Sequence, residues 1–437
     1  MNIHVKDFGV LPHDELVQTA GIQAAIDACA ESGGGTVSFD VGTYRTGTIW
    51  LRSNTYLNIP PMCRIKGSDS FDDYNAADAF PQNKAIVSEY ANGAHLIIAH
   101  EIENCGIIGG GIIDGNGRHF GFKKEPGFVR PQQMISFVES SNVRIQNVEL
   151  LNSAFWTCHV YGCENVWLTG LKVKNNKDIE NCDGLDIDCS KNVVISDCII
   201  DTQDDCITFR GCAQNFQRNP SPALENVTVT NCVLTTDCNA FRIGVGFWPI
   251  RNCRVSNVTI RNAFKGICLE SRYHFNTDAI PGTEIENISF NNCYLDARIP
   301  IFVSSNCFGV FDAPAPKIRN ISFSNMTIAG AENIVIQSNE HTVVENITFS
   351  NIDFDLNGIP KKCIDKYGYG EWDRVTSSAA FCTANVKRLT MRDVRIHIAE
   401  EASPINKGII SYGSDLRISN VEADRAGNPV EVCEVRE

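Results

Sequence analysis

The sequence predicts an all-β solenoid in which short strands wind into stacked coils, and three observations support this fold class. An Asn followed by alternating apolar and polar residues recurs along the chain. The strand-like runs are short and bounded by Asn, Asp and Gly, and no helical stretch separates them. Alternation with period 2 indicates strands, and self-similarity at a regular spacing is typical of a repeat architecture.

The repeat begins at asparagines that lie about 30 residues apart, a length typical of solenoid units. These positions are Asn142, Asn165, Asn192, Asn226, Asn257, Asn287, Asn320 and Asn346. Such a unit is too long for a hexapeptide helix, and its strands are too closely spaced for βαβ units, so we expect wide coils with three sheets. Each Asn can satisfy the backbone groups of a turn and stack on its equivalent in the next coil.

The open N-terminal end of a solenoid needs a cover, and residues 19–31 can supply it. In this segment Ile22, Ala25, Ile26 and Cys29 fall on one helical stripe, and a run of glycines follows it. The pattern predicts an amphipathic cap helix within a cap region of about residues 1–50.

A single parallel β-helix domain over residues 1–437 is the organisation that we expect, because elongated β architectures hold long chains in one core. One segment breaks the rhythm of the repeat. Residues 361–374 contain a cluster of Tyr, Gly and Trp, which indicates a loop insertion.

Charge and composition narrow the possible partners. The chain has a formal net charge of -14 and is 43% hydrophobic, so its surface repels nucleic acid and anionic membranes at long range. We expect neither as a partner, and the oligomeric state stays open. The N-terminal residues do not show a basic segment followed by an apolar run, from which we expect a protein without an export signal.

The cysteines also favour a protein that is not exported. There are 19 of them, none in a C-x-x-C pair, and many lie within apolar runs. Small buried thiols in a core explain this placement better than zinc or redox sites. Because that many free thiols fit a reducing environment, we expect a cytoplasmic protein.

Two acidic clusters fall about one coil apart and are the first candidates for chemistry. Asp183, Asp186 and Asp188 precede one Asn repeat, and the adjacent Asp204 and Asp205 follow it. Coils stack about 4.8 Å apart, so side chains that diverge can reach the ~6.5–9.5 Å carboxyl separation of an inverting glycosidase. Strict alternation would send Asp204 and Asp205 to opposite faces, which predicts a bend at this pair.

Repulsion between neighbouring carboxylates raises one pKa and so provides both a proton donor and a base. Two other interpretations of the acidic clusters remain open: a turn with solvated aspartates, and a calcium site, because several Asp on adjacent turns suit a hard cation. We expect neither a metal nor a cofactor.

A family resemblance extends over residues 5–350. The segments Asp7-Phe-Gly-Val, Gly42-Thr-Tyr-Arg-Thr-Gly47, Gly109-Gly-Gly-Ile-Ile-Asp114-Gly-Asn-Gly117, Arg130-Pro131, Asn152-Ser-Ala-Phe-Trp156, Asn181-Cys-Asp183-Gly184 and Asp204-Asp205-Cys206 together resemble glycoside hydrolase family 28, the polygalacturonases. The resemblance implies a single-stranded right-handed parallel β-helix and inverting hydrolysis. It also implies that Asp204 is the general acid and that Asp183 and Asp205 hold and deprotonate the attacking water.

Two positions depart from the family pattern. Asn239 stands where polygalacturonases carry an active-site His, and Glu270 stands where they carry a Lys for the galacturonate carboxylate. Because a Glu repels a uronate, we expect ordinary homogalacturonan to be a poor substrate. The substrate-binding candidates are Asp186, Arg210, Asn239, Arg242, Trp248, Glu270, Arg272 and His274.

The function that these residues favour is an inverting glycoside hydrolase acting on a pectin-like or related polysaccharide or oligosaccharide. Two other functions compete with it. A β-helix lyase would need calcium and a base that abstracts a C5 proton, whereas a noncatalytic carbohydrate-binding β-helix would explain the missing His. The sugar, the linkage and the choice between endo and exo action stay open.

Overall fold

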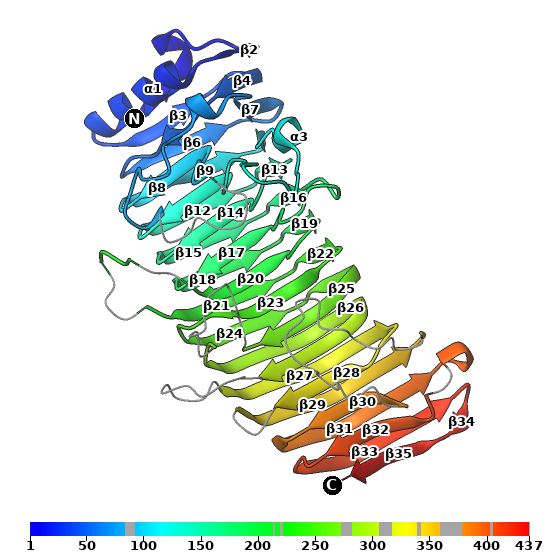
Figure 1. Ribbon diagram of the computed structural model, residues 1–437. Helices are drawn as coiled ribbons and strands as arrows, with labels where there is room; N and C mark the ends of the chain where they lie inside the picture. Colours follow the sequence, from blue (N-terminus) through cyan, green and yellow to red (C-terminus); the bar gives the residue numbers. More distant parts are fainter. Residues whose placement is uncertain are drawn as a thin grey trace. The chain divides into compact units, whose positions relative to one another are not determined.

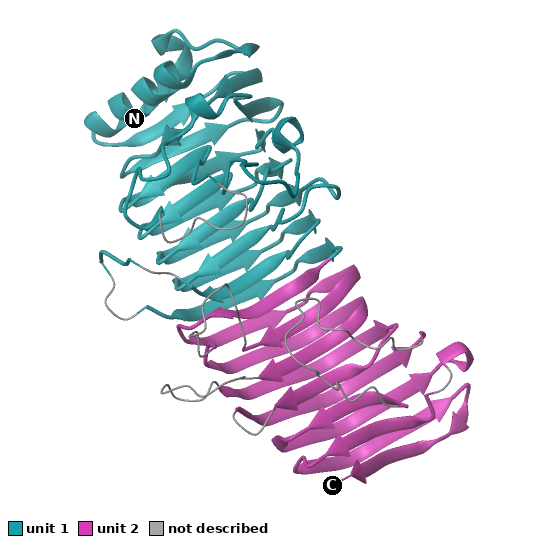
Figure 2. Cartoon of the chain, viewed as in Figure 1, with its two compact units in different colours: residues 1–237 teal, residues 238–437 magenta. Residues whose placement is uncertain are grey.

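The computed structural model describes most of the chain (Figure 1). The described residues are 1–83, 92–212, 215–218, 222–271, 282–305, 317–338, 342–358, 378–402 and 405–436. They form two compact units, Met1–Asp237 and Cys238–Glu437 (Figure 2). Within the described residues, no helix has the length and apolar character needed to span a membrane.

Unit 1 is built from three parallel sheets, and each coil except the first and the last contributes one strand to each sheet. The first contains β1 (Asn2–His4), β3 (Gly35–Ser38), β6 (Thr55–Ile59), β9 (Glu103–Gly109), β12 (Ser141–Gln146), β15 (Glu164–Thr169), β18 (Lys191–Ser196) and β21 (Leu224–Thr230). The second contains β2 (His13–Val17), β4 (Gly42–Thr46), β7 (Cys63–Gly67), β10 (Ile112–Asp114), β13 (Glu149–Leu151), β16 (Lys172–Lys174), β19 (Ile199–Thr202) and β22 (Val233–Thr236).

The third sheet carries the site described below. It contains β5 (Ile49–Trp50), β8 (Ile97–His100), β11 (Ile135–Val138), β14 (Cys158–Tyr161), β17 (Leu185–Asp188) and β20 (Ile207–Gly211). Period-2 alternation places one apolar ladder in the core, because Ile135, Cys158, Leu185 and Ile207 are in register and each is 0% exposed.

Stacked asparagines mark the predicted turn on successive coils, with one correction: Asn287 stacks on Asn252, whereas the predicted Asn257 belongs to a second ladder and accepts a hydrogen bond from Asn292. The Nδ2 of Asn165 donates to Asn142 over 3.2 Å, and Asn192 and Asn226 each donate to the preceding Asn over 3.1 Å. The φ angles of these four asparagines lie between 53° and 59°, a left-handed region that Asn tolerates better than most residues. The repeat therefore specifies both the turn conformation and the contact between coils.

The cap helix is confirmed as α1 (Thr19–Glu31). Its buried stripe consists of Ile22, Ala25, Ile26 and Cys29, each 0% exposed, so the amphipathic pattern orients the helix onto the coils beneath it. The shorter helical segments of unit 1 are η1 (Val5–Phe8), η2 (Phe71–Asp73) and α3 (Gly117–Phe120).

Unit 2 uses fewer and longer strands. One ladder runs through β23 (Asn239–Gly246), β25 (Thr259–Glu270), β26 (Ile285–Ser305), β28 (Ile334–Ser338), β30 (Ala379–Ala384), β32 (Lys407–Tyr412) and β35 (Glu431–Arg436). The other runs through β24 (Ile250–Ser256), β26, β27 (Lys317–Gly330), β29 (Val343–Leu356), β31 (Val386–Ile398) and β33 (Leu416–Arg425). The segments η3 (Glu400–Ala402) and β34 (Asn428–Pro429) complete this unit.

Stacked rings fill the interior of unit 2. The rings of Phe290 and Phe323 lie 5.4 Å apart and those of Phe323 and Phe349 lie 4.7 Å apart, both as parallel stacks. Neighbouring coils thus repeat the same core residue in register.

Two predictions from the sequence concern the organisation of the chain. The loop insertion at 361–374 falls outside the described residues. The single domain over 1–437 stays a prediction. The thiols, by contrast, are described for most positions: seventeen cysteines are free and fourteen of those are buried, as expected for small core residues.

Candidate active site

The turn between the second and third sheets positions the predicted catalytic carboxyls of unit 1. Asp183 lies in the turn from β16 to β17, and Asp205 lies in the equivalent turn of the next coil, from β19 to β20. The register pairs Leu185 with Ile207, which sets Asp183 beside Asp205. The N–H of Gly184 donates to the carbonyl of Asp205 over 2.8 Å and fixes this alignment.

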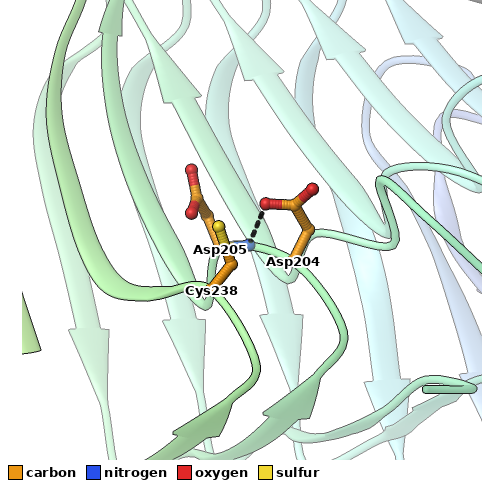
Figure 3. A group of neighbouring side chains, drawn as sticks. All are labelled: Asp204, Asp205 and Cys238. Atoms are coloured by element: carbon orange, nitrogen blue, oxygen red, sulfur yellow. Dashed lines mark hydrogen bonds between the residues drawn. The ribbon is translucent and has the colours of Figure 1, made fainter. Parts of the chain in front are cut away.

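A bend at Asp204 brings its carboxyl to the same side as that of Asp205 (Figure 3). The hydroxyls of Thr202 and Thr236 both donate to the carbonyl of Asp204, and the N–H of Asp205 donates to the Asp204 carboxylate over 3.0 Å. One oxygen of each carboxylate lies within 4.8 Å of the other. The predicted bend is therefore present, and two threonines hold it.

Burial and repulsion control the proton at Asp183. Its side chain is 4% exposed, and burial raises its pKa well above the usual value, with the charges of Asp186, Asp204 and Asp205 adding to the shift. Asp205 is 8% exposed and Asp204 is only half-buried. A carboxyl group that resists ionisation beside two others gives the cluster a proton to exchange.

Asp186 and Arg210 lie on the neighbouring strands β17 and β20. The Nη1 of Arg210 donates to Asp186 over 3.2 Å, and the guanidinium lies 4.2 Å from the centre of the Trp156 ring. Burial raises the pKa of Asp186 to about 7, although the positive charge of Arg210 opposes this shift. Arg210 therefore stabilises the interior of the site: it neutralises the Asp186 carboxylate and stacks on the Trp156 ring.

His159 was not among the predicted site residues, yet it pairs in register with Asp186. Its Nε2 lies 3.8 Å from the carboxylate of Asp188. Burial lowers the pKa of His159, because the imidazole is fully enclosed. For Asp188, burial alone would raise the pKa, but the contact with His159, the charge of Arg210 and the hydrogen bond from the Cys212 N–H together outweigh it, and the pKa falls. The sequence holds one signal that could have found His159. The segment Cys158-His-Val-Tyr161 occupies, in the preceding coil, the same place as Leu185-Asp-Ile-Asp188, so His159 is the equivalent of Asp186.

A row of buried polar side chains crosses four strands beside the carboxyls. Ser136, His159, Asp186 and Thr208 are paired in register and each is 0% exposed. The Oγ of Ser136, the Oδ2 of Asp186 and the Oγ1 of Thr208 have no hydrogen-bond partner within the described residues. Buried polar atoms are almost always satisfied, so this enclosed row is suited to hold ordered water beside the carboxyls.

Part of the cover over this face comes from residues 215–218. The Phe216 ring stacks on Tyr161 at 5.3 Å, and the N–H groups of Gln217 and Arg218 each donate to the carboxylate of Glu139 over 2.7 Å. Glu139 thus anchors a segment that lies far from it in the sequence.

The remaining candidates in the described residues belong to unit 2. Arg242 on β23 forms an ion pair with Glu270 at the end of β25, at 3.1 Å, and Asn239 is 7% exposed at the start of β23. The carbonyl of Trp248 accepts a hydrogen bond from Thr283. The carboxylate of Glu270 is therefore paired with Arg242, a cation of the same unit. The candidates Arg272 and His274 lie outside the described residues.

Comparison with known proteins finds a family match over part of the chain. Residues 63–234 match the model of glycosyl hydrolases family 28. The chain is 24% identical over 273 residues to polygalacturonase QRT2 of Arabidopsis thaliana, covering 55% of this chain and 62% of that protein. It is 26% identical over 271 residues to an exo-poly-alpha-D-galacturonosidase of Dickeya chrysanthemi, covering 49% and 43%. The chain thus spans less than two thirds of these relatives.

Solved structures confirm the fold class. A hyperthermoactive exopolygalacturonase from Thermotoga maritima superimposes with a TM-score of 0.67 at 20% identity, over 82% of this chain and 88% of that one. A family 28 exopolygalacturonase from Yersinia enterocolitica gives a TM-score of 0.67 at 17% identity, over 99% and 79%. Their similarity assigns the described coils to the right-handed parallel β-helix fold.

Proposed function

We propose that this chain, which through residues 63–234 belongs to the glycosyl hydrolases of family 28 and is polygalacturonase-like, is an active hydrolase. It hydrolyses glycosidic bonds in a galacturonan-type polysaccharide or oligosaccharide. The observation that carries the proposal is the alignment of Asp183 and Asp205 on neighbouring coils, with Asp204 turned to the same side as Asp205. Three carboxyl groups at one turn supply the acid and base that glycoside hydrolysis requires.

The roles within the cluster follow from exposure and from the family resemblance. Asp204 is the most exposed of the three, so it is the group best placed to give a proton to the glycosidic oxygen of a bound sugar. A water held by Asp183 and Asp205 attacks the anomeric carbon and loses its proton to one of them. The bond between this carbon and the leaving oxygen breaks in the same step, which inverts the anomeric configuration.

Proton sharing makes these roles compatible with the raised pKa of Asp183. Closely spaced carboxyls titrate as a group, and the proton moves among them. Burial favours the neutral form of Asp183 in the absence of substrate. We infer that the substrate oxygen draws that proton through Asp204, which leaves Asp183 ionised and able to act as a base.

Specificity away from ordinary homogalacturonan is the second part of the proposal. Glu270 stands at the position where the family resemblance implies a uronate-binding Lys, and its partner at 3.1 Å is Arg242. A cation that is already paired attracts a uronate less strongly, and the carboxylate of Glu270 repels it. We therefore propose a neutral or differently charged sugar at this position. The free thiols of the described residues support a reducing compartment, so we also propose that the protein works in the cytoplasm.

The experiment that tests the function is hydrolysis of defined pectic oligosaccharides by the unaltered protein and by Asp204→Asn. We expect the unaltered protein to release reducing ends without added calcium and the variant to lose most of this activity. Asp40→Asn is the control, because the side chain of Asp40 is 56% exposed and lies elsewhere in unit 1. Unsaturated products would indicate a lyase, and equal, negligible turnover by both proteins would indicate a carbohydrate-binding protein.

A further inference from the structure

A pocket of about 430 Å³ opens in unit 1 at a distance from the catalytic carboxyls. Its walls include the aromatic rings of Phe71, Phe120 and Phe128 and the polar side chains of Asp69, His119 and Glu125. The rings of Phe71 and Phe120 lie 4.9 Å apart and form one side of it. A volume of this size suits a small ligand such as one or two sugar rings.

The pocket lies at the same turn of the coil as the carboxyls. Asp69 follows β7 and Phe120 follows β10, just as Asp183 follows β16. These strands stack in the order β7, β10, β13, β16. Because neighbouring coils are about 4.8 Å apart, the wall at Phe120 is roughly 10 Å from Asp183 along the coils. This distance corresponds to a few sugar rings of one extended chain.

Specific contacts hold the pocket wall against the turn that carries Asp183. Arg130, which is 0% exposed, donates to the carbonyl of Glu180 over 2.6 Å and to the side chain of Asn181 over 3.1 Å. The Nε of Arg118 donates to Asn176 over 2.6 Å. The segment that forms the pocket and the segment that positions the catalytic carboxyl are therefore held together by several hydrogen bonds.

Polar atoms continue from the carboxyls toward the coil of Phe120. Asp186, His159 and Ser136 lie on β17, β14 and β11 in that order, and β11 follows the segment that contains Phe120 and Phe128. The Oγ of Ser136 and the Oδ2 of Asp186 are buried without partners in the described residues. Both atoms are fully enclosed, so ordered water beside the glycan path, and not the glycan itself, is suited to satisfy them.

The pocket is unsuited to a uronate. Its lining contains two carboxylates, Asp69 and Glu125, and no Lys or Arg; Asp69 pairs with Arg45 and Glu125 with Lys123, but neither cation lines the pocket. Burial alone would raise the pKa of Asp69, but hydrogen bonds from Asn116 and Arg45 outweigh it and hold the pKa below its usual value, so this side chain is anionic at neutral pH. A sugar acid would meet like charge. An uncharged ring can instead stack on the phenylalanines and donate its hydroxyls to the carboxylates.

We propose that this pocket is a subsite for a neutral sugar residue of the substrate, located a few rings from the bond that is cleaved. The inference rests on the proposed function in taking the ligand to be a glycan. The inference adds that binding of an uncharged sugar in this pocket selects substrates that contain both a cleavable linkage and a neutral portion.

Binding to the inactive Asp204→Asn protein tests the subsite without turnover. Titration calorimetry with galacto-oligosaccharides, xylo-oligosaccharides and trigalacturonate is the measurement. We expect one of the two neutral series to bind, and Phe120→Ala and Glu125→Gln each to weaken that binding about tenfold, a loss of about 1.4 kcal/mol. Glu164→Gln, on the exposed surface of β15, is the matched control and should leave it unchanged.

Failure of the subsite and failure of the proposed function give different results. If the unaltered protein cleaves pectic glycans but neutral oligosaccharides do not bind, or bind equally to the Phe120→Ala and Glu125→Gln proteins, the subsite is wrong and the hydrolase stands. If neutral oligosaccharides bind in a Phe120-dependent way and no glycan is cleaved, the subsite stands and the hydrolase is wrong. With a substrate that reaches the pocket, Phe120→Ala should raise KM and leave kcat unchanged.

Discussion

Gly184 donates its backbone N–H to the carbonyl of Asp205 over 2.8 Å, and this contact between two coils helps to align the carboxyls proposed as catalytic. It places Asp183, one residue before Gly184, next to Asp205. Added side-chain volume at Gly184 would collide with the neighbouring coil, since a Cβ there would lie 2.4 Å from the carbonyl oxygen of Cys206. Alignment of the carboxyls thus depends on the stacking of the coils.

Replacement of each catalytic carboxyl by an amide should remove turnover while the fold is kept. Asp183→Asn, Asp204→Asn and Asp205→Asn each preserve side-chain shape but remove one proton-transfer role, worth about 10²–10⁴ in rate. We expect losses of that size in kcat/KM, with far-UV spectra and melting temperatures close to those of the Asp40→Asn control. A variant that keeps more than a tenth of the activity would remove that residue from the mechanism.

The raised pKa of Asp186 predicts a specific dependence of stability on pH. Folding moves this pKa from 3.8 to about 7, so the folded state binds the proton more tightly than the unfolded state. The resulting stabilisation is fully present below about pH 4 and is lost as the pH rises toward 7. Asp186→Asn should therefore show a free energy of unfolding that falls less between pH 4 and pH 7 than that of the unaltered protein.

Urea denaturation at several pH values measures this effect, which is on the order of a few kcal/mol over the whole range. The comparison uses the change with pH, because the altered contact with Arg210, which loses its ion pair, shifts the stability of the variant in its own right. Parallel pH curves for the two proteins would show that Asp186 ionises as readily in the folded state as in the unfolded state.

Glu270 provides the test of specificity. Glu270→Gln removes a carboxylate that repels uronates and neutralises Arg242, so kcat/KM for homogalacturonan should rise about tenfold or more, as expected for removal of a like charge. Glu345→Gln is the control, since Glu345 forms another Glu–Arg pair of 3.1 Å in the same unit, with Arg388. Efficient hydrolysis of homogalacturonan by the unaltered protein would contradict the proposed specificity.

Thiol titration tests the proposed compartment. Seventeen of the 19 cysteines are described as free thiols, and a reducing environment would keep them so. We expect Ellman titration of the denatured, unreduced protein, purified anaerobically from its native source without reductant or alkylating agent, to find most of the 19 cysteines as free thiols. Recovery of nine disulfides would place the protein in an oxidising compartment instead.

The stacked coils could be predicted because the repeat is local in sequence. An Asn that suits a left-handed turn and alternating strands specify each coil, and equal spacing specifies the stack, so the ladder from Asn142 to Asn226 was readable in advance. The bend at Asp204 was readable for a related reason. Two adjacent carboxyls serve one site only if strict alternation is interrupted.

Contacts between distant segments were not predictable in the same way. The Arg242 and Glu270 pair depends on the register between β23 and β25, which the Asn spacing does not specify. His159 was missed because a single His on an apolar strand carries no local signal, and only its register with Asp186 reveals it. The pocket at Phe120 is formed by segments that follow β7 and β10, and such segments carry no repeat.

The anomeric configuration of the first product tests the central claim most directly. If Asp204 is the acid and a water held by Asp183 and Asp205 is the nucleophile, the attack occurs on the face opposite to the leaving group. Proton NMR during the first minutes of hydrolysis of a pectic oligosaccharide should show the new reducing end with an anomeric configuration inverted relative to the cleaved bond, before mutarotation mixes the two forms. A retained configuration would require a covalent intermediate with one carboxylate and would contradict the assignment of Asp183 and Asp205 as the groups that activate water.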